Sequence, residues 1–254
     1  MNLHLISLLD CLAQQNIALF CKLDIIRLAV FRTDSAQVSM LLTKIAEFYL
    51  KFFQQIQFLP IGVDMKDYCG CYDFSAGHDV YDRTIREVIN YIHRQELGNE
   101  DDPIPVYIRY SDKTNIYMTC GICWFENEGT EIRVILVRLE IHKQLVGMSP
   151  EDLSYLRELM NRYNTKDIMT LSEFVNATGY NYRQFQRDSK AYFGAPFYKF
   201  LLKMRMVQAA SDIVFSKFSL KEIAFKNEFS DYNAMYKTFK RYQIIVTEIP
   251  RIAA

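Results

Sequence analysis

Residues that could do chemistry are concentrated in two runs near the C-terminal end of this chain of 254 residues. In both runs, arginine, lysine and amide side chains recur at helical spacing. Arginine and the amides can pair bidentately with base edges in the major groove of DNA, whereas lysine neutralises phosphates. The side chains that we expect to contact double-stranded DNA are Arg183, Gln186, Arg187 and Lys190 in the first run, and Tyr232, Asn233, Lys237, Lys240 and Arg241 in the second. For two of these, Lys240 and Arg241, phosphate attraction or plain solvation explains the residue at least as well as base contact does.

The first run is positioned by a predicted helix, tight turn and helix between Leu171 and Gly194. Gly179 supplies a left-handed turn residue, and Asn181 caps the second helix, which carries the polar side chains. A second helix of this kind fits the major groove. Taken alone, the segment could also be an ordinary helical hairpin with a solvated basic face.

The second run predicts the same order of helix, tight turn and helix about 48 residues later, between Ser219 and Tyr242. Ser219 and Glu222 predict a capping box, Phe229 anchors the turn, and Ser230 or Asp231 caps the next helix. A long helix from Phe197 to about Phe215 is expected to join the two units. Two units joined in this way would place two helices in neighbouring major-groove segments.

Residues 171 to 251 resemble the DNA-binding domain of the AraC/XylS family of bacterial transcription regulators. The matching segments are GYNYRQFQR in the first unit, FLLKMRMVQAA on the connecting helix, and IAFKNEFSDYNAMYKTFKRY followed by Arg251 in the second. The resemblance implies a sequence-specific regulator of transcription. It also implies base-reading roles for Arg183, Gln186, Arg187, Tyr232, Asn233 and Lys237.

Four positions depart from the family pattern. Glu228 stands where the family places a turn glycine, and because glutamate is strained at positive φ, we expect that turn to be reshaped or destabilised. Ser189 occupies the place of a core phenylalanine, and Ile244 and Thr247 replace a glycine and a proline. These changes affect the expected affinity of the second unit more than the fold.

Charge is distributed unevenly along the chain, although the formal net charge is zero. Residues 166 to 254 hold 14 Lys and Arg against 8 Asp and Glu, so the remainder carries the opposite, acidic excess. A basic region beside an acidic one fits a polyanionic partner for the basic region. The apolar stretch from Met40 to Pro60 is interrupted by charges, and the N-terminus lacks the basic flank of a secretory signal, so no membrane association and a cytoplasmic location are expected.

The N-terminal half predicts an α+β domain over residues 1–148. Helices are expected at 37–54 and 79–96, the second capped by Asp79, and strands at 62–72, 105–110, 115–125 and 131–141. A linker helix over 149–165 is expected to open at Ser149-Pro150-Glu151-Asp152, and residues 166–254 then form the all-α DNA-binding domain with its two helix-turn-helix units.

Cysteines give the sharpest chemical pattern in this half. Cys69 and Cys71 form a CxC motif, and Cys120 and Cys123 a CxxC motif. Four thiolates could hold zinc or form a redox switch. Their strand-like, aromatic-rich surroundings favour buried, structural cysteines instead, so no metal is expected.

Aromatic residues in the same half offer a different hypothesis. The order of strand, helix and strands weakly resembles half of the GyrI-like effector-binding fold, whose domains hold small molecules in an aromatic cleft. That resemblance implies a cleft lined by Tyr68, Tyr72, Tyr107, Tyr110, Tyr117 and Trp124. An aromatic core without a ligand explains the same residues and is the preferred interpretation.

The leading hypothesis is a DNA-binding regulator whose N-terminal domain senses a small-molecule effector or mediates dimerisation. The alternatives make that domain a protein-interaction module or a thiol or zinc sensor. RNA polymerase and a second copy of the chain are the further candidate partners. No nucleotide-binding, phosphate-loop or nucleophile motif is present, so neither an enzyme nor a cofactor is expected.

Overall fold

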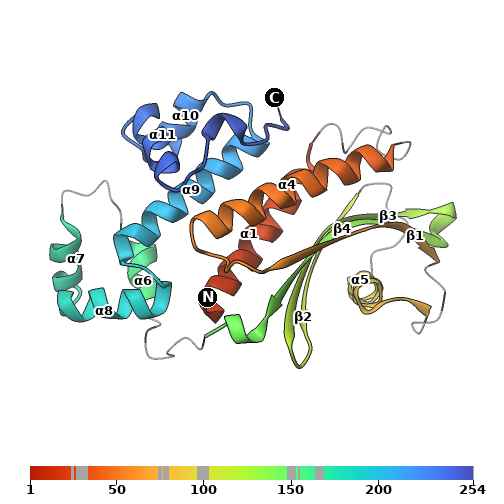
Figure 1. Ribbon diagram of the computed structural model, residues 1–254, viewed down its shortest axis with the longest axis horizontal. Helices are drawn as coiled ribbons and strands as arrows, with labels where there is room; N and C mark the ends of the chain where they lie inside the picture. The colour runs from red at the N-terminus through yellow and green to blue at the C-terminus, as the bar shows by residue number, and fades with distance from the viewer. Residues whose placement is uncertain are drawn as a thin grey trace.

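The computed structural model describes residues 1–23, 26, 34–73, 76, 80–95, 103–147, 153, 155–163 and 169–253, which form an α+β region followed by a helical region (Figure 1). The first region contains helices α1 (Leu3–Cys21), α4 (Ser35–Gln55) and α5 (Arg83–Arg94) and strands β1 (Asp64–Asp73), β2 (Ile104–Ser111), β3 (Asn115–Glu126) and β4 (Glu131–His142). The second contains α6 (Tyr155–Arg162), α7 (Leu171–Ala177), α8 (Tyr182–Phe193), α9 (Phe197–Phe215), α10 (Leu220–Lys226) and α11 (Tyr232–Arg241). This order confirms the predicted fold class.

The four strands form one antiparallel sheet in the order β1-β4-β3-β2. Strands β2, β3 and β4 follow one another as a meander, and β1 pairs with β4 at the far edge. Side chains alternate between the two faces because the strand period is two. On β3, Ile122 and Trp124 therefore face one side, and Cys123 faces the other.

Each face of the sheet is covered by helices. Helix α5 packs on one face through Ile85, Val88, Ile89 and Ile92, all of which are buried. Helices α1 and α4 cover the opposite face, and they lie between the sheet and the C-terminal helices (Figure 1). The helices α1 and α4 are thus packed on two sides.

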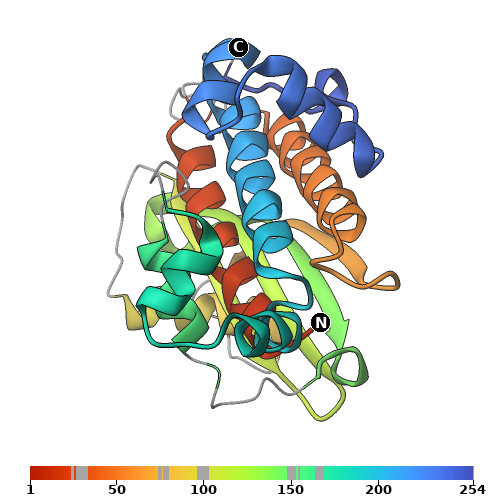
Figure 2. The same ribbon diagram turned by 90° about the vertical axis from the view of Figure 1, so that its left-hand side faces the viewer.

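The C-terminal helices share a core with this helical layer. The ring of Phe58, which follows α4, lies 5.6 Å from the ring of Phe200 on α9, and Phe52 on α4 lies 6.2 Å from Phe239 on α11. Ser211 Oγ on α9 donates to Asn16 Oδ1 on α1 at 3.0 Å. One hydrophobic cluster consequently extends from α1 to the final residues, and Figure 2 shows α9 running beside α1 and α4.

Helix α1 was not expected from the sequence. Its side chain at Asn2 caps the first turn by accepting from Leu5 N, and six of its apolar residues are buried. Among the described helices, α1 alone has the length and composition to cross a membrane, a test that core helices of soluble proteins also pass. In this structure its apolar side chains pack against the sheet and the C-terminal helices.

One predicted helix start differs from the structure, and a second lies outside the described residues. Helix α5 begins at Arg83, with Asp82 as its cap accepting from Ile85 N at 3.1 Å, so the expected start at Asp79 is wrong. Asp82 lies directly before the first turn of the helix, so its side chain can accept from the backbone amides that have no partner within the helix. Asp79 itself and the segment Ser149–Asp152 lie outside the described residues, and the helix of the expected linker is α6, from Tyr155 to Arg162.

Candidate nucleic-acid interface

The first helix-turn-helix unit consists of α7, a tight turn and α8. A capping box starts α7, in which Thr170 Oγ1 accepts from Glu173 N at 3.3 Å and Glu173 Oε2 accepts from Thr170 N at 2.7 Å. Gly179 turns the chain at φ +85°, and Asn181 Oδ1 caps α8 by accepting from the backbone amides of Arg183 and Gln184. The turn and the cap are as predicted, and the capping box has the T-x-x-E sequence signature at Thr170 and Glu173, which the prediction does not include.

Helix α8 divides into a buried and an exposed face. Phe185, Ser189, Tyr192 and Phe193 are buried against α9 and α1. The predicted DNA-contacting residues lie on the other side, where Arg183, Arg187 and Lys190 are exposed and Gln186 is half-buried. Arg187 Nη2 donates to Gln184 Oε1 at 2.5 Å, so its guanidinium is held along the helix surface.

The second unit, α10 and α11, has the same construction. Ser219 and Glu222 form the predicted capping box, and Asp231 rather than Ser230 caps α11, accepting from Ala234 N at 2.7 Å. The four polar residues expected to contact DNA on this helix are exposed, and Tyr232 is half-buried with its ring 6.1 Å from that of Tyr236. The exposed four are Asn233, Lys237, Lys240 and Arg241.

The turn of the second unit keeps its shape despite Glu228. Glu228 adopts φ +60°, Glu228 N donates to Phe225 O at 3.2 Å, and Phe229 N donates to Ala224 O at 2.9 Å. The first turn forms the same two hydrogen bonds around Gly179. The expected reshaping is therefore wrong, and the expected left-handed strain is present.

A charged contact supports this strained residue. Arg205 on α9 donates from Nη2 to Glu228 Oε2 at 2.7 Å and from Nη1 to the Glu228 carbonyl at 3.3 Å. The guanidinium therefore holds both the side chain and the backbone of the turn against α9. Sequence reasoning did not connect Arg205 with Glu228, because they lie on different elements.

The two units also share their core positions. Phe185 on α8 and Met235 on α11 occupy equivalent positions in the two units, and both are buried. The same holds for Ser189 on α8 and Phe239 on α11. Ser189 thus stands at a core position, as expected, and its hydroxyl is buried without a hydrogen-bond partner among the described residues. An unpaired buried hydroxyl destabilises a protein by about 1–3 kcal/mol.

A comparison with models of protein families agrees with this geometry. Residues 174–243 match the protein-family model described as "Helix-turn-helix domain". These residues form an AraC-type helix-turn-helix domain. Such a domain places the chain among DNA-binding transcription regulators.

One solved structure that is similar to part of the chain is the C-terminal domain of the two-component response regulator yesN from Fusobacterium nucleatum subsp. nucleatum ATCC 25586. It shares 24% identity, with a TM-score of 0.34, over 39% of this chain and 98% of its own. No curated protein matches the chain.

Helix α6 is attached to the AraC-type domain. Tyr155 Oη donates to Asp188 Oδ2 on α8 at 2.6 Å, and the Tyr155 ring stacks on Tyr180 at 4.3 Å. Tyr163, just after α6, packs against Phe174 and Phe197. The first unit therefore includes contacts from residues that precede the matched segment.

The six aromatic residues of the predicted effector cleft do not share one face of the sheet. Trp124 is buried on the side of α1 and α4, and Tyr107 donates to Asp10 on α1. The other four lie on the side of α5 or at its edge, namely Tyr68, Tyr72, Tyr110 and Tyr117. The structure accordingly does not bring the six residues together.

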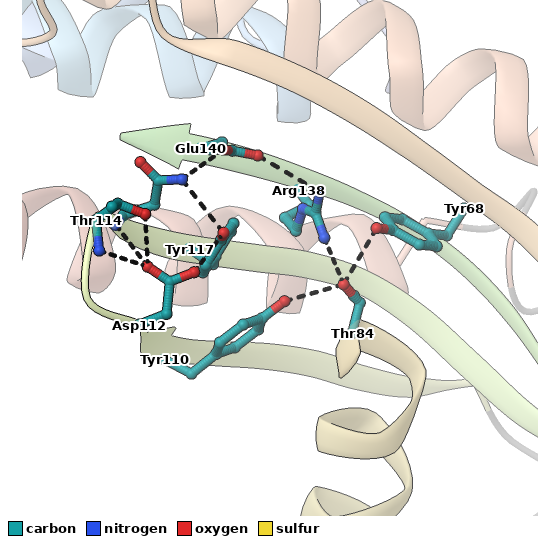
Figure 3. Close-up of polar contacts among 9 residues, drawn as sticks. Tyr68, Thr84, Tyr110, Asp112, Thr114, Tyr117, Arg138 and Glu140 are labelled. Atoms are coloured by element: carbon teal, nitrogen blue, oxygen red, sulfur yellow. Dashed lines mark hydrogen bonds and ion pairs between the residues drawn. The ribbon is translucent and has the colours of Figure 1, made fainter. Parts of the chain in front are cut away.

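Three of these four tyrosines surround Arg138, as Figure 3 shows. The Arg138 guanidinium lies 5.4 Å from the centre of the Tyr68 ring and 5.0 Å from that of Tyr117, and Nη1 donates to Thr84 Oγ1 at 2.8 Å. Thr84 in turn donates to Tyr68 Oη at 3.1 Å and lies 2.9 Å from Tyr110 Oη. Burial raises the pKa of Tyr68, so its hydroxyl stays protonated. These contacts join α5 to the sheet, and the interpretation of an aromatic core without a ligand stays a prediction.

The four cysteines are also separated. Strand β4 lies between β1, which carries Cys69 and Cys71, and β3, which carries Cys120 and Cys123. Because neighbouring strands are about 4.8 Å apart, the two pairs are separated by about twice that distance. Cys123 also faces α5, whereas Cys120 faces α1 and α4. The four thiols cannot meet around one metal ion in this arrangement.

Each cysteine has its own surroundings. Burial raises the pKa of both Cys120 and Cys123 to about 12, so these thiols stay protonated. Cys71 is exposed, and its Sγ lies 3.2 Å from Glu131 Oε2 and 3.5 Å from Glu126 Oε2. Glu126 is already bound by Arg133 at 2.6 Å, and this contact lowers its pKa.

Proposed function

We propose that this protein binds specific DNA sequences through α8 and α11 and regulates transcription in the bacterial cytoplasm. The observation that carries this proposal is the repetition of one capped helix-turn-helix construction, in which both second helices have exposed basic or amide side chains. A helix of this kind lies in the major groove in known helix-turn-helix complexes.

In this proposal, some side chains of each unit read bases and others contact phosphates. Arg183, Gln186 and Arg187 read bases, because guanidinium and amide groups match base edges in pairs. Lys190, Lys240 and Arg241 contact phosphates, because positive charge there strengthens binding without selecting a sequence. Tyr232, Asn233 and Lys237 read bases in the second site.

The N-terminal region controls how the two units are held. The contacts of Phe52 with Phe239 and of Phe58 with Phe200 place α4 and the loop after it against both ends of the AraC-type domain. A change in this layer would therefore alter the arrangement of α8 and α11. This supports a sensing role for the N-terminal region over a detached interaction module.

The experiment is selection of bound sequences from a randomised duplex pool by the full chain, followed by titration of the selected duplex and a scrambled duplex at two salt concentrations. We expect affinity for both to fall steeply with salt, because bound phosphates release counterions. We also expect the selected duplex to bind at least about 10³-fold more tightly. Equal affinity for both duplexes would contradict sequence-specific recognition, and no salt dependence would contradict DNA binding itself.

A further inference from the structure

A cavity lies between the sheet and the helices that connect it to the AraC-type domain. Its walls come from α1, α4, β3, β4 and the end of α9, and its volume is about 90 Å³. Apolar cavities of about 150 Å³ hold benzene in another protein, so this smaller cavity admits a molecule of one ring only when the wall side chains move apart. The apolar part of the wall includes Ile17, Phe20, Ile45, Met118 and Phe215.

The wall offers few polar groups and no charged one among its lining residues. Asn16 and Tyr49 are its hydrogen-bonding side chains, together with the thiol of Cys120. Without a charged partner, a buried carboxylate or ammonium group on a ligand would be strongly disfavoured. The wall chemistry therefore selects an uncharged molecule.

The hydroxyl of Tyr49 is the polar group that such a molecule would satisfy. Tyr49 is only 7% exposed, and its Oη forms no hydrogen bond of good geometry with the described residues, although Asn16 and Ser211 lie near it. Burial raises the pKa of Tyr49 well above its usual range, so the hydroxyl keeps its proton. It can donate one hydrogen bond or accept one, and leaving it unpaired destabilises the empty state.

We infer that this cavity is a binding site for a small, uncharged, largely apolar molecule that carries one hydroxyl or carbonyl group, the size of a simple phenol. The ring fills the space between α1, α4 and the sheet, and the oxygen pairs with Tyr49. This site is separate from the six aromatic residues that the sequence suggested.

The position of Phe215 links this site to DNA. Phe215 is the last residue of α9, which joins the two helix-turn-helix units, and its side chain is part of the cavity wall. Ser211, one turn earlier, is hydrogen-bonded to Asn16 in the same wall. A ligand that moves this wall moves the helix that sets the relation of α8 to α11. The role of the site as an effector site rests on the proposed function, whereas the binding itself rests on the cavity.

The first experiment uses the full chain with phenol as probe and benzoate, its charged relative of similar size, as control. We expect phenol to raise the melting temperature saturably, by about 2 °C or more, and benzoate to leave it unchanged. The buried, protonated thiol of Cys120 is alkylated only when the cavity opens, so we also expect phenol to slow this reaction, measured peptide by peptide by mass spectrometry, without affecting exposed Cys11 and Cys69. Absence of both effects, or equal effects from benzoate, would overturn the site.

Variants locate the bound probe. Ala13→Leu fills the cavity from α1, and Ala18→Leu adds the same side chain on α1 at a residue outside the cavity wall. We expect Ala13→Leu to abolish the rise in melting temperature with phenol and Ala18→Leu to keep it.

Tyr49→Phe tests the hydrogen bond to the ligand. This variant should reduce the preference for phenol over toluene at least threefold. Undiminished phenol binding by Ala13→Leu, or an unchanged preference in Tyr49→Phe, would overturn the assignment. Should Ala13→Leu not fold, protection of Cys120 in the parent chain and the Tyr49→Phe preference decide the question.

The last measurement is titration of the selected duplex with and without saturating phenol. We expect the dissociation constant to change about fivefold or more. If the chain bound phenol and DNA but this constant did not change, the effector role would be wrong. If the chain bound no duplex, the proposed function would be wrong, and the melting and alkylation results would still decide whether the cavity is a ligand site.

Discussion

Exposed cations on the two recognition helices differ in what they can discriminate. The guanidinium of Arg187 presents a planar pair of donors near the middle of α8, held along the helix by Gln184. The ammonium group of Lys240 is a compact charge on the last turn of α11. A planar pair of donors can distinguish one base edge from another, and a point charge cannot.

We therefore expect Arg187→Ala to weaken binding of the selected duplex by about 1–3 kcal/mol and to relax the preference at one base pair. Lys240→Ala should weaken the selected and scrambled duplexes about equally and lower the salt slope by about one charge. Both variants are titrated against both duplexes at two salt concentrations. The opposite pattern, uniform loss for Arg187→Ala and selective loss for Lys240→Ala, would show that these roles are reversed.

Glu228 provides a second test at the level of one residue. Its left-handed backbone favours glycine by about 1 kcal/mol, while its carboxylate pairs with Arg205. Both Glu228→Ala and Glu228→Gly remove the ion pair with Arg205. The alanine variant keeps the backbone strain at positive φ, whereas the glycine variant relieves this strain. We expect the free energy of unfolding to be about 1 kcal/mol higher for Glu228→Gly than for Glu228→Ala, measured by denaturant titration of the full chain. Equal stability of the two variants would mean that the turn is unstrained.

Local signals predicted individual residues well where the relevant partners are near in sequence. The cap at Asn181 and the glycine turn follow from spacing within one unit, and Asp231 is one of the two caps that the spacing offers for α11. The core position of Ser189 follows from the resemblance to the AraC/XylS family. The support that Arg205 gives to Glu228 could not be predicted in this way, because the two residues meet only when α9 and α10 pack together.

Helix α1 shows the corresponding limit at the scale of elements. A helix with one buried face has a clear polar and apolar periodicity, and α4 and α5 were predicted on that basis. Helix α1 packs against both the sheet and the helices α8 and α9, so apolar residues occur around much of its circumference. The periodicity is weak as a result, and the segment resembled a short apolar run instead of a core helix.

The contact between α1 and the AraC-type domain contains a titratable group. The His4 ring lies 4.5 Å from Tyr192 and 5.4 Å from Phe193, and neither ring nitrogen has a hydrogen-bond partner among the described residues. Burial, and next the positive charge of Arg157 on α6, lower the pKa of His4 to about 4. The native interface therefore holds the neutral imidazole.

This makes stability depend on pH. In the unfolded chain the imidazole binds its proton near pH 6.5, whereas in the folded chain it does so only near pH 4. Between these values the unfolded state binds more protons, so stability is lost as pH falls through this window. We expect His4→Leu to flatten this part of the stability profile, measured by denaturant titration from pH 7 to pH 4, and Gln14→Leu on the exposed side of α1 to leave it unchanged. A parent-like slope in His4→Leu would place the acid sensitivity elsewhere.

At the scale of the whole molecule, the chain was divided by prediction into residues 1–148, 149–165 and 166–254. That division stays a prediction, and the hydrophobic cluster crosses it from α1 and α4 to α9 and α11. The sequence does not predict that the α+β region packs against the AraC-type domain. The apolar faces of α4 and α9 would be equally consistent with two separate hydrophobic cores. Only the three-dimensional packing shows that the α+β region and the AraC-type domain share buried side chains.

A shared core predicts that the two regions unfold together. Trp124, the single tryptophan, is buried in the sheet, so its fluorescence reports on the N-terminal region. Far-ultraviolet circular dichroism reports mainly on the helices, many of which lie in the C-terminal region. We expect both signals to change at the same denaturant concentration, as in a two-state transition.

Phe52→Ala tests whether the shared core is the reason for that coincidence. Phe52 is 1% exposed and contacts Phe239 on α11, so its removal should lower the free energy of unfolding by about 3–5 kcal/mol. Met40→Ala on the same helix removes a side chain that is 67% exposed and should change it by less than about 0.5 kcal/mol. If the core is shared, Phe52→Ala moves the fluorescence and dichroism transitions by the same amount. The AraC-type domain would be an independent folding unit if the two signals separated in the parent chain, or if only the fluorescence transition moved in the variant. In that case the shared core could not transmit the effect of a ligand from the N-terminal region to the DNA-binding helices.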